Sequence, residues 1–381
     1  MLCAFCVCSI AVLAGVGGGG ILVPMFCALM GLPMSAAVGL SQSTICGQSL
    51  LNVCLAVWKR YPDPACSRPL INYQYLTLLV PLGVIGTLVG GVLAKLCPDL
   101  VRLVLLFLLL VLVLYRTVKK MIAQYRKDHN TAEGSGSTSV PAEERGQFEV
   151  GTETVSPEFT QPQFPPLEII CVLTSFIVNV GFNTWRSKTI CGGAVYIACL
   201  CVPVVVNIAL FLWSRLRLSR MDQHLVTFTW NYSITILYPL VALIAGGAAA
   251  MLGIGGGLVL NFVLYEAGFI PEEASLTGGV VTFFLAFSSA LDLLMGGQLL
   301  IDYGLVLFAC GMASTALGQF CFMRLIKKYN LRYLIIASLA TIIGGSLIAL
   351  SSYSIYQSVI VVRADGSIMA PGRVCPLKTN T

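Results

Sequence analysis

The sequence predicts an all-α protein that crosses a membrane several times, and three observations support this fold class. The chain of 381 residues is 57% hydrophobic and 10% charged, whereas a soluble domain carries about 25% charged residues. Apolar runs close to the roughly 20 residues that a membrane-spanning helix needs recur along the chain. Two glycine-rich stretches interrupt these runs at corresponding places. We therefore expect two repeated helical modules with about eight to ten membrane segments in total.

The glycine-rich stretches indicate an internal duplication. The first extends from Gly15 to Gly20, and the second extends from Gly253 to Gly257. Each module is therefore expected to contain one glycine-broken helix. An alignment without gaps pairs further small residues, placing Gly18, Gly19 and Gly20 on Gly255, Gly256 and Gly257, Gly31 on Gly268, and Ala37 on Ala274.

Broken helices inside a membrane create sites for anions. Glycine destabilises a helix by about 1 kcal/mol per residue relative to alanine, so several in a row should unwind it. Lipid offers no hydrogen bonds, and unwound backbone therefore survives only inside protein or beside a water-filled cavity. The helix that resumes after the break presents N–H groups and a positive dipole end. Two such helices at matched positions of two repeats indicate the binding site of a transporter.

The glycines allow two other interpretations. The segment from Gly15 to Gly20 fits the dinucleotide-binding pattern G-x-G-x-x-G, but no acidic residue follows about twenty positions later, and Leu258 breaks the pattern in the second copy. Small residues also let membrane helices pack closely. The duplication favours a binding site, and close packing stays open as the alternative.

Changes in composition divide the chain into five parts. A stretch rich in Ser, Thr, Glu, Gly and Pro has too little apolar content to offset its ordering entropy, and we expect it to be disordered. Two apolar runs after it have no counterpart in the first half. The parts are a first membrane module (1–122), the disordered linker (123–165), two additional transmembrane helices (166–230), a second membrane module (231–353) and a polar C-terminal tail (354–381).

Basic residues predict how the modules are oriented. In the first module the loop after the second element holds Lys59 and Arg60, whereas its equivalent at 296–302 has no basic residue. The positive-inside rule therefore places corresponding loops on opposite sides of the membrane. Re-entrant hairpins at the glycine breaks give the odd number of crossings that this requires. We expect the linker and the loops at 215–220 and 324–332 on the cytoplasmic side, with the C-terminal tail opposite.

Metal, cofactor and catalytic sites are not expected. Most of the 15 cysteines lie within apolar runs, where cysteine behaves as a small hydrophobic residue. His129 and His224 fall in polar loops, and no Cys-x-x-Cys pair has a second ligand pair, so neither zinc nor a disulfide framework is predicted. No span combines His, Cys and acid in a catalytic arrangement. The net charge of +6 lies mostly in loops and speaks to orientation rather than to nucleic acid.

The candidate substrate-binding residues are the break glycines and the polar residues close behind them. Such polar residues also form hydrogen bonds between membrane helices, and that alternative stays open. Acidic residues within spans are typical of proton-coupled carriers, so Glu266 and Asp292 are candidate coupling groups, although both also fit the membrane interface. The substrate-binding set is Gly18, Gly19, Gly20, Ser41, Ser43, Thr44, Gly255, Gly256, Gly257, Asn261, Thr277 and Thr282.

These motifs resemble the sulfite exporter TauE/SafE family, in particular its plant and protist branch. Both glycine stretches, each followed by Gly, Ala and Ser or Thr at the spacings given above, look like the signature of that family. The segment from Arg68 to Tyr73 is similar to the Pro-Leu-Ile-Asp-Tyr element of the branch, with Asn72 in place of Asp. The resemblance covers about residues 14–121 and 236–352. Asn261 stands where the first repeat has Pro24, so the two hairpins are not equivalent.

The resemblance implies a carrier that moves small sulfur-containing anions such as sulfite or organosulfonates across a membrane. We therefore expect an integral multi-pass membrane protein, not an enzyme, whose partners are a small anion and lipid. Neither a cofactor nor nucleic acid is expected to bind, and a homodimer stays open. The alternative is a membrane scaffold or receptor that keeps the fold without transport.

Overall fold

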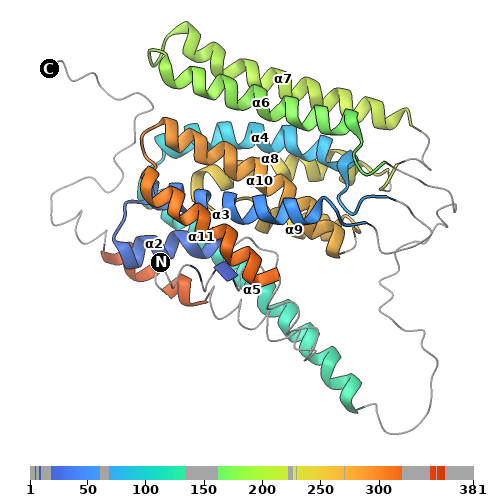
Figure 1. Ribbon diagram of the computed structural model, residues 1–381. Helices are drawn as coiled ribbons and strands as arrows, with labels where there is room; N and C mark the ends of the chain where they lie inside the picture. The colour runs from blue at the N-terminus through green and yellow to red at the C-terminus, as the bar shows by residue number, and fades with distance from the viewer. Residues whose placement is uncertain are drawn as a thin grey trace.

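A computed structural model describes residues 5, 8–9, 19–60, 68–133, 162–221, 226–228, 230–269, 271–319, 344–348 and 350–356. The regular structure within these residues is helical, and most helices lie side by side along one common direction, with α5 inclined to them (Figure 1). Five helical segments in this part of the chain are long and apolar enough to cross a membrane. These findings confirm the predicted all-α polytopic membrane fold class. The internal duplication and the five-part division of the chain stay predictions.

The described helices keep the order of the chain. α5 continues past the predicted start of the linker at 123, because extending a helix that is already formed costs little per residue. Further helical turns lie at 344–348 and 350–356. The helices are α2 (Gly19–Met30), α3 (Met34–Ala56), α4 (Tyr73–Leu96), α5 (Asp99–Glu133), α6 (Pro166–Lys188), α7 (Ala194–Ser219), the π-helix η2 (Ser233–Leu237), α8 (Tyr238–Leu252), α9 (Gly257–Glu266), α10 (Pro271–Met295) and α11 (Ile301–Leu317).

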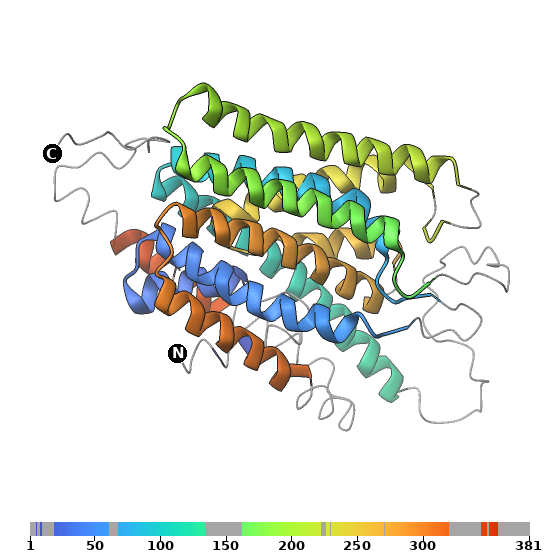
Figure 2. The same cartoon turned by 45° about the horizontal axis from the view of Figure 1, so that its top comes forward.

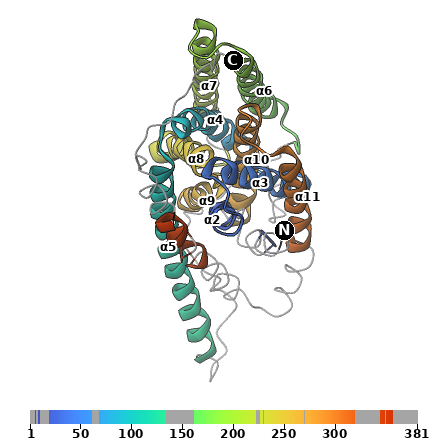
Figure 3. The same cartoon turned by 90° about the vertical axis from the view of Figure 1, so that its left-hand side faces the viewer.

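The helices form a central group with a layer on one side. Seen along the helices, α2, α3, α8, α9 and α10 lie at the centre, with α5 and α11 toward opposite edges (Figure 3). α6 and α7, the two additional transmembrane helices of the prediction, form a separate layer on one side (Figure 2). α3 is long enough to span but is not apolar enough to be one of the five spanning segments. Its polar side chains Gln42 and Gln48 are buried by neighbouring helices, which explains how they are tolerated.

Glycines bring α4 and α8 into backbone contact. A Cβ atom added at Gly86 would clash with the carbonyl oxygen of Leu243, and one added at Gly246 would clash with that of Gly83. Small residues at helix interfaces are how membrane helices approach closely. At the start of α4, Tyr75 donates to the carbonyl oxygen of Ile234 just before α8, 3.0 Å away. Since the starts of the two helices meet here and their later residues meet at Gly86 and Leu243, the two helices run parallel.

Contacts along α10 fix the directions of its neighbours. The hydroxyl groups of Thr87 in α4 and Ser288 in α10 lie 3.2 Å apart, and one turn further along both helices Gly91 faces Asp292. α4 and α10 are therefore parallel. Between α3 and α10 the order is reversed, since Gly39 faces Leu293 whereas Gly279 faces Asn52. α3 and α10, which the alignment pairs as equivalent helices, therefore run in opposite directions.

The chain turns back at the second glycine break. α9 runs antiparallel to α10, because Gly257 at its start lies against Thr282 and Asn261 one turn later lies against Gly278. α8 is parallel to α4 and therefore to α10. α8 and α9 thus run in opposite directions, as expected of a re-entrant hairpin. Three glycines in the connection have the positive φ angles that favour glycine, namely Gly253 (76°), Gly255 (72°) and Gly256 (74°).

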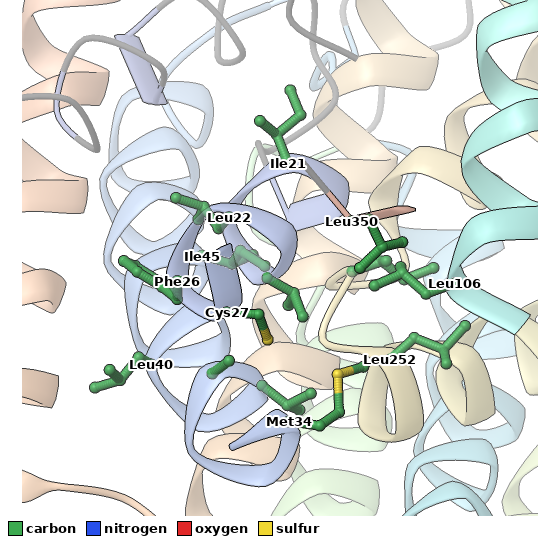
Figure 4. Close-up of a cluster of buried hydrophobic side chains, with 14 of the residues drawn as sticks. Ile21, Leu22, Phe26, Cys27, Met34, Leu40, Ile45, Leu106, Leu252 and Leu350 are labelled. Carbon is green, nitrogen blue, oxygen red and sulfur yellow. The ribbon is translucent and has the colours of Figure 1, made fainter. Parts of the chain in front are cut away.

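α2 is the matching half-helix of the first module. It joins α3 through a short turn at Gly31, whose φ is 63°, and its first residue, Gly19, lies against Ile45 in the middle of α3. α2 therefore returns along α3 as α9 returns along α10. Figure 4 shows Leu22, Phe26 and Cys27 of this half-helix within a cluster of buried hydrophobic side chains. The segment before α2, which would form the first arm of this hairpin, lies outside the described residues except for three positions.

Charge and one disulfide distinguish the two ends of the bundle. Arg68 before α4 and Arg217 late in α7 lie at one end, and the α6–α7 turn lies at the other. Cys191 in that turn is disulfide-bonded, although no disulfide framework is predicted from the sequence. The other cysteines in the described part of the chain are free.

Candidate functional site

The two glycine breaks meet in the middle of the bundle. A Cβ atom added at Gly19, the first residue of α2, would lie 2.5 Å from the carbonyl oxygen of Ile254 and 2.6 Å from Cδ1 of Ile45. One added at Gly257, the first residue of α9, would clash with Oγ1 of Thr282. Both glycines are buried. Since Ile45 and Thr282 lie halfway along α3 and α10, both half-helices begin at mid-depth.

Two helix N-termini therefore converge on one place from opposite directions. α2 runs antiparallel to α3 and α9 antiparallel to α10, and α3 and α10 themselves run in opposite directions. Each N-terminus carries a partial positive charge of about half a unit and N–H groups without intrahelical acceptors. The buried basic side chains of the described residues, Arg102 and Arg186, belong to helix ends instead. The backbone thus provides the positive potential at this site, which suits a small anion.

Polar side chains of α3 hold the tip of the second hairpin. Ser41 Oγ donates to the carbonyl oxygen of Gly253 (2.8 Å), and Gln42 Nε2 donates to that of Ala249 (2.5 Å). Gly253 caps the C-terminal end of α8, and the carbonyl oxygen of Ala249 in the last turn also accepts from the backbone N–H of Gly253 (2.9 Å). Gln42 is not among the residues predicted to bind substrate, although it is adjacent to Ser41 in the sequence.

Two of the predicted hydroxyl groups bond elsewhere. Ser43 Oγ donates to the carbonyl oxygen of Gly304 in α11 (2.7 Å), and Thr44 Oγ1 donates to that of Leu40 within α3 (2.8 Å). Ser43 therefore ties α3 to α11, as the alternative interpretation of these polar residues expects, whereas Thr44 bonds within its own helix.

The second module contributes unequally to the meeting point. Thr282 of α10 lies against Gly257, the first residue of α9, and its Oγ1 donates to the carbonyl oxygen of Gly278 (2.7 Å). Asn261, one turn into α9, is buried against Gly278. Thr277 lies away from this place, since its Oγ1 accepts from the backbone N–H of Asn72 (3.1 Å) before α4. Of the remaining predicted residues, Gly20, Gly255 and Gly256 are buried around the breaks, whereas Gly18 lies outside the described residues.

A buried charge pair beside Thr277 was not predicted. Glu273 in the first turn of α10 is 2% exposed and accepts from both Arg68 Nη1 (2.8 Å) and Nη2 (3.0 Å). Asn72 Nδ2 donates to the same carboxylate (3.1 Å), while Asn72 Oδ1 caps α4 by accepting from the N–H of Tyr75 (3.0 Å). From the sequence alone, the segment from Arg68 to Tyr73 shows only a resemblance to a family element. Its contacts tie the start of α4 to the start of α10.

The two candidate coupling residues lie away from the meeting point. Glu266 is the last residue of α9, and its side chain is not among those described. Asp292 lies ten positions beyond Thr282 along α10, in an ion pair with Arg186 of α6 (2.5 Å), with Lys95 of α4 3.8 Å away. Neither residue is therefore part of the central site as the structure presents it, and a coupling role stays a prediction.

Comparisons with known proteins give one consistent relationship. A model described as "Sulfite exporter TauE/SafE" matches residues 1–152. Sulfite exporter TauE/SafE family protein 3 of Arabidopsis thaliana is 26% identical over 368 residues, covering 91% of this chain and 76% of the relative. Family protein 5 of the same organism is 23% identical over 380 residues, covering 93% and 82%. A comparison with solved structures finds no match. Over most of its length the chain is therefore similar to proteins of the sulfite exporter TauE/SafE family.

Proposed function

We propose that the protein is a secondary transporter of small oxyanions, with sulfite or an organosulfonate bound between the starts of α2 and α9. The convergence of two half-helix N-termini at mid-depth is the observation that carries this proposal. The family description and the names of the relatives refer to sulfite export and support the substrate class. Proteins of this family are transporters rather than enzymes.

Backbone N–H groups of both half-helices would bind the anion. The first N–H groups of a helix have no intrahelical acceptor, and the helix dipole favours negative charge beside them. A buried site strengthens such hydrogen bonds because little water competes. Glycine at positions 19 and 257 keeps Cβ atoms out of the narrow space beside Ile254 and Thr282. If backbone dipoles alone hold the anion, no positively charged side chain of the protein faces it that would hinder its release.

The opposed directions of the two half-helices also suggest a route to alternating access. The half-helices start at one place and leave it in opposite directions, so movement of one hairpin opens the site toward one side only. The connection between α8 and α9 contains three glycines with positive φ, at which small rotations meet little steric resistance. Ser41 and Gln42 bind the tip of this hairpin to α3 and would have to release it.

Sulfite flux tests the proposal directly. Proteoliposomes containing the full chain are expected to take up labelled sulfite in a saturable manner, and an excess of methanesulfonate or taurine is expected to compete. Protein-free liposomes made from the same lipids are the control. Flux equal to this control for sulfite, sulfate and several sulfonates would contradict transport and favour the membrane scaffold. A homodimer stays a prediction that the same preparation can address by its mass in detergent.

A further inference from the structure

A second charged cluster lies at the end of the bundle opposite the basic loops. It joins Asp292 of α10 to Arg186 of α6 at 2.5 Å and, more loosely, to Lys95 of α4 at 3.8 Å. The exposed fractions of the three side chains are 6% for Arg186, 16% for Asp292 and 23% for Lys95. The side chain of Arg186 is thus almost fully buried, whereas that of Lys95 is partly exposed.

The cluster has one more positive charge than negative charge, and one of its donors is unused. Arg186 Nη2 donates to Asp292 Oδ1 (2.5 Å) and to Asn183 Oδ1 (2.7 Å). Arg186 Nη1 is equally buried, yet no acceptor in the described part of the chain lies within hydrogen-bond distance of it. The guanidinium carbon also lies 5.7 Å from the ring centre of Tyr196 in α7, a face that attracts cations but offers no acceptor oxygen. The buried positive charge of Arg186 and its buried, unused Nη1 donor both favour a binding partner that supplies negative charge.

We propose that this cluster is a second binding site for a small oxyanion, distinct from the central one. The anion would accept from Arg186 Nη1 and Lys95 Nζ, which would bring the cluster to charge balance. Asp292 acts as its resident counter-ion, because the carboxylate already occupies one edge of the guanidinium group and competes with an incoming anion. Gly91 allows this arrangement, since a Cβ atom there would lie 2.6 Å from Asp292 Oδ2.

This cluster lies where an anion would enter or leave the protein. Asp292 and Thr282 are ten positions apart on α10, which corresponds to about 15 Å along the helix. The cluster faces α4 and α6, whereas Thr282 faces α9. An anion that leaves the central site on the side away from the basic loops would meet this site near the surface. This assignment rests on the proposed function, because it takes the transported anion as the ligand.

Binding stoichiometry separates the two sites. Calorimetric titration of the purified full chain with sulfite is expected to give two sites in the wild type and only the central one in Arg186→Gln. Loss of a charge-assisted hydrogen bond weakens binding about tenfold or more, which would remove the second site from the measured range. Lys188→Gln, which removes an exposed charge at the end of the same helix, is the matched control and should keep both sites.

Whether a second substitution raises or lowers the affinity for the anion distinguishes a binding role from a structural role. Asp292→Asn removes the competing counter-ion and is expected to tighten the second site, whereas Arg186→Gln abolishes it and Arg186→Lys restores part of it. Equal weakening by Arg186→Gln and Asp292→Asn would overturn the proposal in favour of a purely structural ion pair. A single site in the wild type that Arg186→Gln leaves unchanged would also overturn it, while transport through the central site would stand. Loss of both binding and flux in the wild type would instead refute the proposed function itself.

Discussion

Replacing Gly19 by alanine is expected to reduce sulfite flux by about a hundredfold, the loss that a displacement of about 1 Å causes at a precise site. The added Cβ atom would lie 2.5 Å from the backbone oxygen of Ile254 and 2.6 Å from Cδ1 of Ile45. Ile45 can change its rotamer, but a backbone carbonyl within a tight turn cannot easily move. The starts of α2 and α9 must therefore separate, and one anion can no longer contact both. Flux into proteoliposomes measures the loss.

A glycine elsewhere provides the matched control. Gly181 lies within α6, and a Cβ atom added there would have no heavy atom within 4 Å. Gly181→Ala should therefore leave flux unchanged and could stabilise the helix by up to about 1 kcal/mol. Wild-type flux in Gly19→Ala, with the protein correctly inserted, would contradict the site between the half-helices. Equal loss of flux in both variants would point to folding instead.

Replacing Glu273 by glutamine is expected to destabilise the protein by about 3 kcal/mol, the lower end of the cost of breaking a buried ion pair. The carboxylate is 2% exposed and accepts from both terminal nitrogens of Arg68 and from Asn72. A neutral amide cannot balance the guanidinium charge, and one of its two heavy atoms is a donor facing other donors. A lower Tm in detergent, followed by size-exclusion chromatography after heating, reports the effect.

The adjacent residue gives the control for this prediction. Glu272 is exposed in the same first turn of α10, so Glu272→Gln removes the same charge at the same helix end. A surface substitution of this kind should change stability by no more than about 0.5 kcal/mol. If both variants melt alike, the contact between Arg68 and Glu273 does not hold α4 to α10, and the role assigned to this pair is wrong.

The fold class and the positions of the helix breaks were predictable because a membrane restricts which backbone conformations a chain can adopt within it. Lipid excludes unpaired backbone groups, so apolar runs of helical length identify helices, and consecutive glycines within them identify a break. The meeting of Gly19 with Ile254 follows the same logic, since unwound backbone must be covered by protein. Charge counting then suggested a chain that turns back, and the observed directions of α8 and α9 agree with that expectation.

Side-chain roles were less predictable because they depend on how each helix is rotated about its axis. Ser41 and Ser43 are two positions apart, so they point about 200° apart on a helix; one reaches the hairpin and the other reaches α11. The pairing of Arg186 with Asp292 depends on where α6 packs, and the duplication says nothing about α6 because that helix has no counterpart in the first half.

The central claim is that the chain turns back at the second glycine break, so that α9 begins inside the membrane. Labelling with a membrane-impermeant maleimide at Tyr232→Cys, Glu272→Cys and Gln298→Cys tests this most directly, since all three positions are exposed and flank α8, α9 and α10. The signal of the unsubstituted chain is the background in intact and inverted vesicles. We predict that Tyr232→Cys and Glu272→Cys are labelled from the same side and Gln298→Cys from the other. Labelling of Tyr232→Cys and Glu272→Cys from opposite sides would mean that the chain crosses at the glycines, and would contradict the hairpin and the anion site built on it.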